Sequence, residues 1–191
     1  MNRRTRILWV AAGMILVVGL GIALLFTYWR TPPGSDAADE PSEQRPAIER
    51  ETVAEFDAFR MVIPVGWERV PDRERPHSRL DLFIRGPLVD GQNLVIAVQQ
   101  LDVLKGTQLD GFVNNFTSDW PMSEFPIEQD VSFCGQDARM LGFTNEDGDN
   151  LVIMFMHKDN GFVVVSVAPA TRMPDCWQTF FNVLQGFQLY E

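Results

Sequence analysis

Few side chains in this sequence have the type and spacing that metal or acid–base chemistry requires. The histidines are His77 and His157, and His157 with Asp159 supplies only half of a zinc site, because such sites use three or four ligands. The run NEDGDN at 145–150 resembles a calcium loop, but it lacks the ligand spacing and the terminal Glu of an EF-hand. Its Asx and Gly residues are typical of a turn. We therefore predict no metal site.

Catalytic motifs are also missing. The sequence contains no G-x-S-x-G, S-x-x-K or H-E-x-x-H, patterns that place a nucleophile beside its base or two histidines on zinc. The paired carboxylates Asp147 and Asp149 fall in the same predicted turn, where nothing indicates the burial that shifts a pKa for acid–base work. We expect a protein that is not an enzyme and that carries no cofactor.

The two cysteines, Cys134 and Cys176, are the only ones in the chain. In an oxidising compartment, a single pair favours a structural disulfide, here between a turn near residue 134 and the start of the last helix. A redox or metal-binding thiol pair is the alternative, but the C-x-x-C spacing is missing. We predict the disulfide.

The charge of the chain excludes one class of partner. The formal net charge is −10, and nucleic-acid binding needs clustered cations. Arginines nevertheless gather in one segment that follows a Pro-x-Gly-Trp sequence. A solvated charged loop is one interpretation; the other is a partner-binding surface, for which the candidate residues are Trp67, Arg69, Arg73, Arg75 and Arg79.

Residues 7–29 are apolar and uncharged, long enough as a helix to cross a hydrocarbon core of roughly 30 Å. The arginines of residues 1–6 place the N-terminus in the cytoplasm. We predict a single-pass signal anchor in a bacterial inner membrane, with the remaining chain in the periplasm or outside the cell. A cleaved signal peptide, using the small residues at 21–23, is the alternative. The spacing of Gly19 and Ala23 suits a weak homodimer of the anchor.

Residues 30–52 are acidic and rich in proline, which is typical of a disordered linker. The globular domain then covers residues 53–191. Periodicity predicts seven strands, at 59–64, 80–86, 93–101, 127–133, 136–143, 151–158 and 162–169. It also predicts amphipathic helices at 109–120 and 174–190.

The strands at 151–158 and 162–169 are almost continuously apolar, so both faces of their sheet must be covered. Asp159-Asn160-Gly161 between them is a strong hairpin signal. The predicted fold is α+β, a three-layer α/β/α sandwich with a mostly antiparallel sheet, in the order of three strands, a helix, four strands and a helix.

The segment FRMVIPVGW at 59–67, this element order and the closing LQGF at 184–187 together resemble the PsbP-like superfamily. That group includes the extrinsic photosystem protein PsbP and the bacterial DcrB lipoproteins. The resemblance covers about residues 56–191 and implies a sandwich used for binding or assembly rather than catalysis. It carries over no partner or metal residue, and the anchor and the cysteine pair depart from the pattern.

Two functions remain after these exclusions. The first is a membrane-anchored accessory domain that binds another cell-envelope protein. The second is a small-ligand or lipid-binding module with a pocket between sheet and helix, lined by Trp67, Trp120 and Trp177.

Overall fold

The computed structural model describes residues 51–118, 120, 125–145 and 148–191. The predicted cytoplasmic segment 1–6, the anchor 7–29 and the linker as far as residue 50 lie outside this range. Among the described residues, no helix has the length and the apolar character needed to cross a membrane.

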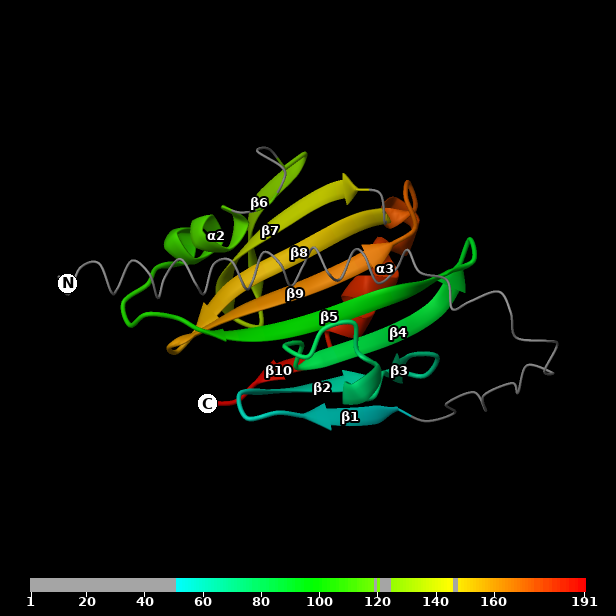
Figure 1. The fold of residues 1–191 in the computed structure, drawn as a ribbon, viewed down its shortest axis with the longest axis horizontal. Helices are drawn as coiled ribbons and strands as arrows, with labels where there is room; N and C mark the ends of the chain where they lie inside the picture. Colours follow the sequence, from blue (N-terminus) through cyan, green and yellow to red (C-terminus); the bar gives the residue numbers. More distant parts are fainter. Residues whose placement is uncertain (1–50, 119, 121–124, 146–147) are drawn as a thin grey trace.

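A seven-stranded antiparallel sheet forms the centre of the domain, in the order β3-β4-β5-β9-β8-β7-β6 (Figure 1). Its strands are β3 (Glu68–Arg69), β4 (Leu82–Val89), β5 (Gln92–Asp102), β6 (Ile127–Phe133), β7 (Gln136–Asn145), β8 (Gly148–His157) and β9 (Asn160–Ala168). Strand β8 is buried from Gly148 to Phe155, because its side chains face a covering layer on both sides.

One face of this sheet is covered by helix α2 and by the arginine loop, which we define as residues 69–81. Helix α2 (Leu109–Thr117) buries Phe112, Val113 and Phe116 against β7, β8 and β9. The arginine loop contains the short 3-10 helix η1 (Asp72–Glu74) and packs Val70 and Leu80 over β4 and β5. The two coverings share this face between them.

The opposite face is covered by helix α3 (Met173–Leu184) and a second, three-stranded sheet. That sheet consists of β1 (Thr52–Glu55), β2 (Phe59–Ile63) and β10 (Phe187–Leu189), in the order β1-β2-β10. Phe59 of β2 stacks on Phe187 and meets Phe162 of the large sheet edge to face. These rings join the two sheets into one core.

The predicted α+β class, the antiparallel pairing and the helices on opposite faces are confirmed, and three short strands were not predicted. The strand at 59–64 belongs to the small sheet rather than to the large one. Residues 187–189, predicted as helix, form β10, with Phe187 opposite Met61. The apolar spacing of Phe187 suits a helix face, but pairing with β2 overrides it because the strand buries the ring on the same core.

The hairpin between β8 and β9 turns one residue earlier than the sequence indicates. His157 pairs with Asn160, so the turn residues are Lys158 and Asp159, and Lys158 has a positive φ of 57°. Gly161 lies within β9, where an added Cβ would stand 2.5 Å from the Phe112 ring of α2. The glycine is needed for the close approach of α2 and not for the turn.

The predicted disulfide between Cys134 and Cys176 is wrong, because both thiols are free. Cys134 lies in the β6–β7 turn, and its Sγ is 3.3 Å from the carbonyl oxygen of Phe187, beyond the C-terminal end of α3. Cys176 is buried near the start of α3. The helix rises about 12 Å between Cys176 and Leu184, whereas a disulfide needs Cα atoms within about 7 Å. Burial raises the pKa of the Cys134 thiol to about 11.

The Gly161→Ala substitution tests the contact between α2 and β9. The new methyl group would overlap the Phe112 ring, so we expect the free energy of unfolding to fall by about 1–3 kcal/mol. Gly111→Ala is the matched control, since the nearest atom to its Cβ is Thr107 Cγ2 at 3.9 Å. Because Gly111 lies in the first turn of α2, this substitution should be neutral or stabilise by up to about 1 kcal/mol. Urea denaturation measures both, and equal stabilities of the two variants would contradict the assignment.

Candidate functional site

Trp67, the first residue of the predicted binding surface, belongs to the core. Its side chain is 3% exposed and meets Phe180 of α3 at a ring-centroid distance of 6.1 Å. Gly86 of β4 lies directly under the indole, where a Cβ would stand 2.7 Å from the ring. The Pro-x-Gly-Trp sequence therefore turns the chain with a positive φ at Gly66 and fastens it to the sheet. The Trp67 indole is therefore not accessible to a partner.

Arg75 is also structural. Its side chain is only 6% exposed and pairs with Asp72, and its guanidinium donates to the carbonyl oxygen of Leu80. Burial lowers the pKa of Arg75, and the nearby Asp72 carboxylate opposes that effect. Since Leu80 packs on the sheet, Arg75 closes the arginine loop onto β4 and β5.

The remaining arginines of the loop are accessible. Arg69 stands 5.4 Å from the centroid of the Phe56 ring and contacts Asp72 at 3.4 Å. The Arg73 side chain is 85% exposed and lies 3.3 Å from Glu74, and Arg79 is exposed. Because Asp72 and Glu74 lie among these arginines, the loop is a mixed-charge surface. The structure thus separates Arg69, Arg73 and Arg79, which a partner can reach, from Arg75 and Trp67, which it cannot.

An Arg75→Ala substitution should loosen the loop. It removes a nearly buried guanidinium and leaves the Leu80 carbonyl without its donor, so we expect a loss of about 1–3 kcal/mol of stability. Arg73→Ala is the control, and its effect should stay within about 0.5 kcal/mol because the side chain is solvated. Thermal unfolding compares the two. An Arg75 variant as stable as the Arg73 variant would show that the loop closes without this guanidinium.

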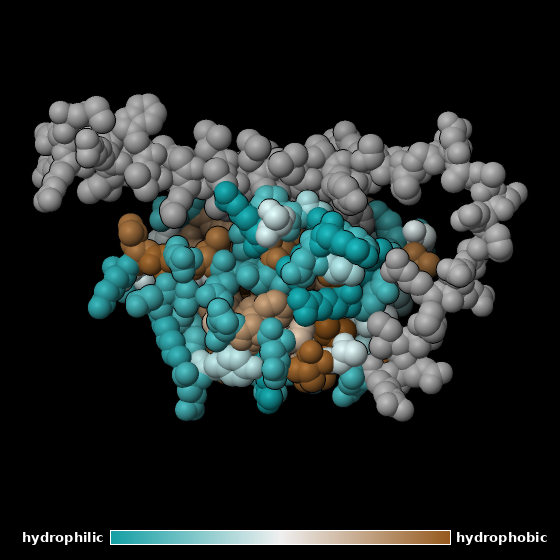
Figure 2. Space-filling view, turned by 60° about the horizontal axis from the view of Figure 1, so that its bottom comes forward, coloured by the Kyte–Doolittle hydropathy of each residue, from teal (hydrophilic) through white to brown (hydrophobic). Residues whose placement is uncertain are grey.

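An acidic depression lies near the arginine loop, where the chain turns from β1 to β2 beside β4 and β5. It has a volume of about 460 Å³ and is lined by Glu55, Phe56, Asp57, Asp81, Gln100 and Asp102. Figure 2 turns forward the side of the domain on which the small sheet lies, where hydrophilic residues predominate and some hydrophobic ones lie among them. Burial raises the pKa of Asp81, although its carboxylate accepts the Gln100 backbone N–H at 2.6 Å. No set of three or more His, Cys, Asp or Glu among the described residues could hold a metal ion.

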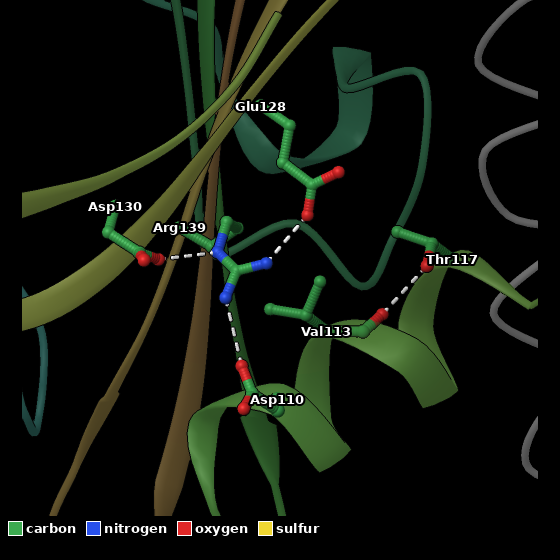
Figure 3. A network of polar contacts seen from close by, with 6 residues as sticks. All are labelled: Asp110, Val113, Thr117, Glu128, Asp130 and Arg139. Carbon is green, nitrogen blue, oxygen red and sulfur yellow. Dashed lines mark hydrogen bonds and ion pairs between the residues drawn. The ribbon is translucent and has the colours of Figure 1, made fainter. Parts of the chain in front are cut away.

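Three carboxylates converge on Arg139 at the β6 edge of the large sheet (Figure 3). The guanidinium of Arg139, on β7, donates to Asp130 at 2.7 Å and Glu128 at 2.6 Å, both on β6, and to Asp110 of α2 at 2.9 Å. Burial disfavours the charged form of Arg139, but the hydrogen bonds to Glu128 and Asp130 raise its pKa. This network could not be predicted from the sequence. Glu128 and Asp130 alternate on a strand, which places them on one face, but Asp110 and Arg139 join them only through the fold.

The other residues considered in the sequence as metal ligands or pocket residues contact other parts of the fold. The Nε2 atom of His157 lies 2.9 Å from the carbonyl oxygen of Tyr190 and so fixes the C-terminal end of the chain. The predicted turn at 145–150 is shorter than expected, since β7 reaches Asn145 and β8 begins at Gly148; Asp147 lies outside the described residues.

The three tryptophans are not brought together: Trp67 and Trp177 pack on the α3 side, whereas Trp120 packs with α2.

Asp149, predicted to lie in a solvated turn, is 8% exposed and caps helix α3. Its Oδ2 accepts the backbone N–H of Met173 at 3.1 Å, and its Oδ1 accepts the Thr144 hydroxyl at 2.7 Å. Burial alone would raise the pKa of Asp149, but hydrogen bonds from Thr144 and from backbone N–H groups at the helix start lower it. A distant strand thus supplies the cap that the local sequence lacks.

The depressed pKa of Asp149 predicts a pH-dependent contribution to stability. The contribution is complete above the ordinary carboxyl pKa of 3.8 and is lost as the pH falls through the lower pKa of the folded protein. Asp149→Asn should cost about 1–3 kcal/mol at pH 7, because an amide NH₂ would face backbone donors, and the cost should shrink in acid. Denaturant unfolding from pH 7 down to pH 2.5 measures it. Asp175→Asn, on the exposed first turn of α3, is the control; a pH-independent cost of Asp149→Asn would contradict the cap.

Comparisons with known proteins identify the fold but no relative in sequence. No protein-family model matches the chain, and no curated protein matches its sequence. The solution structure of CyanoP, the cyanobacterial PsbP of Synechocystis, is similar with a TM-score of 0.53 and 14% identity, covering 82% of this chain and 100% of that one.

Two other solved structures match more weakly. PA94 of Pseudomonas aeruginosa, a protein of unknown function and putative regulator, gives a TM-score of 0.47 with 10% identity over 71% of this chain and 94% of that one. LpqN, involved in cell envelope biogenesis of Mycobacterium tuberculosis, gives 0.44 with 12% identity over 78% and 88%. At 14% identity the CyanoP similarity concerns architecture, and this chain has a PsbP-like fold.

Proposed function

We propose that this chain is a non-catalytic accessory domain that binds another protein of the cell envelope, anchored in the cytoplasmic membrane by residues 7–29 with its globular part outside the cytoplasm. The PsbP-like fold supports the proposal, because the structural similarity to CyanoP extends over the whole of the CyanoP chain. The apolar segment and the arginines before it support the orientation.

The observation that carries the proposal is the position of the charged groups. Among the described residues, Asp149, Asn150 and Ser166 are the buried polar residues, and Asp149 and Asn150 are engaged in hydrogen bonds within the fold. The nearly buried Arg75 side chain is likewise engaged, with Asp72 and Leu80. The arginine loop, the acidic depression and the Arg139 network all lie at the surface. Groups that could recognise a partner therefore point outward, as a docking module requires.

The ligand-binding alternative depends on a pocket shared by the three tryptophans. Trp67 is enclosed by Phe180 and Gly86, Trp177 packs on Phe181 at the α3 side, and Trp120 meets Phe116, Phe125 and Phe143 next to α2. The large sheet separates the first two from the third. Aromatic rings so placed fill the core instead of lining one cavity.

Two measurements on the full chain test the proposal. With an alkaline phosphatase domain fused after Glu191, we expect activity in cells and retention of the fusion in the membrane after carbonate extraction. Deleting residues 1–29 should leave the fusion inactive in the cytoplasm. A full-length fusion that is inactive while a cytoplasmic reporter at the same position is active would overturn the proposed location.

Partner binding is tested with a photo-reactive amino acid placed in the full-length protein in living cells. Positions Arg73, Arg79 and Gln129 sample three exposed places on loop and edge strand, and Gln178 samples the exposed side of α3. We expect a discrete crosslinked protein at one or more of these positions. Absence of any crosslinked protein at all four would count against a docking role.

A further inference from the structure

Strand β6 lies at the edge of the large sheet (Figure 1), and among the residues that the structure describes no strand pairs with its outer side. It pairs with β7 on the other side, and the pair Phe133 and Gln136 flanks a two-residue turn. In such a hairpin the flanking residues exchange both hydrogen bonds, and every second pair then does the same. Residues 127, 129, 131 and 133 therefore bond to β7, and the N–H and C=O groups of Glu128, Asp130 and Ser132 point away from it.

The opposite edge of the sheet differs. Strand β3 has only two residues, and the chain beyond it continues along β4, where the N–H of Val70 donates to the carbonyl oxygen of Phe83 at 2.9 Å. That edge offers little free backbone. Strand β6 has seven residues, enough for the three outward residues to bond an added strand.

The charge beside this edge is negative. Asp110, Glu128 and Asp130 share a single guanidinium, that of Arg139, so three negative charges and one positive charge leave a net −2. The carboxylate side chains are 77%, 49% and 82% exposed, respectively. All three lie on the α2 side of the sheet (Figure 3). A strand added to β6 would place every second side chain on this side, facing the carboxylates.

The other face of β6 is apolar except for the exposed Gln129. Val131 and Phe133 pack on the main core, and Ile127 is 38% exposed. The added strand would place its remaining side chains against these residues. An alternation of basic and apolar residues in the added strand therefore matches β6 on both faces.

We propose that β6 is a docking edge for an extended segment of a partner protein in which Lys or Arg alternates with apolar residues, added antiparallel or parallel as an eighth strand of the sheet. This inference rests on the proposed docking function and names the surface and the chemistry of the partner. Backbone hydrogen bonds provide the affinity, and the carboxylates select basic side chains.

A second copy of the chain is a poorer occupant. Two β6 strands paired antiparallel within one continuous sheet would bring Glu128 and Asp130 of each copy beside those of the other, on the same face. Like charges so placed across strands destabilise the pairing. The charge of the edge thus disfavours self-association while it favours a basic partner.

The experiment uses the full chain in nanodiscs of neutral lipid and a fluorescent ten-residue peptide in which Lys alternates with Val. We expect saturable binding by fluorescence anisotropy that weakens as salt is added, since charge pairs are screened. A peptide of the same composition with all lysines at one end is the control for charge alone. Equal binding of the two peptides would overturn the proposal.

Two sets of variants separate the backbone from the charges. Ser132→Pro removes one outward N–H without breaking the β7 ladder and should weaken binding about fivefold, whereas Ser132→Ala should bind as the wild type does. Glu128→Gln with Asp130→Asn keeps the side-chain shapes and should weaken binding about tenfold, with a smaller salt dependence. If Ser132→Pro does not fold, the double variant decides, and unchanged affinity in it would overturn the proposal. Dimers of the full chain that disappear with Ser132→Pro would also overturn it, in favour of a second copy.

Crosslinking in cells distinguishes this inference from the function on which it rests. A crosslinked protein at Gln129 that is lost with Ser132→Pro and retained with Ser132→Ala supports both. Crosslinks that form only at Arg73 or Arg79 would overturn the β6 inference and leave the docking function standing. No crosslinked protein at any position would overturn both.

Discussion

The central strands are apolar on both faces, and the rest of the structure follows from covering them. Strand β8 is buried from Gly148 to Phe155, and Phe162, Val163 and Val164 of β9 are all buried although they alternate in direction. A sheet of this kind needs a layer on each side. Helix α2 and the arginine loop supply one layer, and helix α3 with the small sheet supplies the other. The loop is part of the fold because it covers β4 and β5, which explains why Arg75 is enclosed while its neighbours are not.

The same constraint determines where recognition can occur. Because aromatic side chains fill the layers on both sides of the sheet, the charged groups are left to the loops and to the sheet edges. The acidic depression, the accessible arginines and the Arg139 network occupy such places. Strand β6 combines free backbone with unbalanced charge, and neither the arginine loop nor the depression offers that combination. A docking domain of this design would recognise its partner by strand pairing and charge, with little apolar surface exposed.

Much of the architecture could be predicted from local patterns, and the errors have physical causes. The limits of β6 coincide with the predicted strand at 127–133, since turn residues bound it on one side. Phe187 was assigned to a helix because its spacing fits a helix face, but it pairs with β2. Gly161 was assigned to the tight turn because glycine favours turns, but it lies in β9 and leaves room for the Phe112 ring. Trp67 and Arg75 were predicted as partner contacts because composition does not show burial. A disulfide between Cys134 and Cys176 was predicted because they are the only two cysteines and the domain was expected in an oxidising compartment. The two thiols lie near opposite ends of α3 and are too far apart to bond.

The sequence by itself determined the longer strands and the two helices, the α+β class and the need for two covering layers, because hydrophobic periodicity and turn residues act over a few neighbouring positions. It also determined that the chain carries no familiar catalytic motif. Tertiary structure alone decided which carboxylates meet Arg139, which arginine closes the loop, that Asp149 caps α3 and which strand ends the sheet. These depend on residues brought together from distant positions, such as Asp110 with Arg139 and Asp149 with Met173. Strand order and layer packing place them side by side, and no local pattern encodes either.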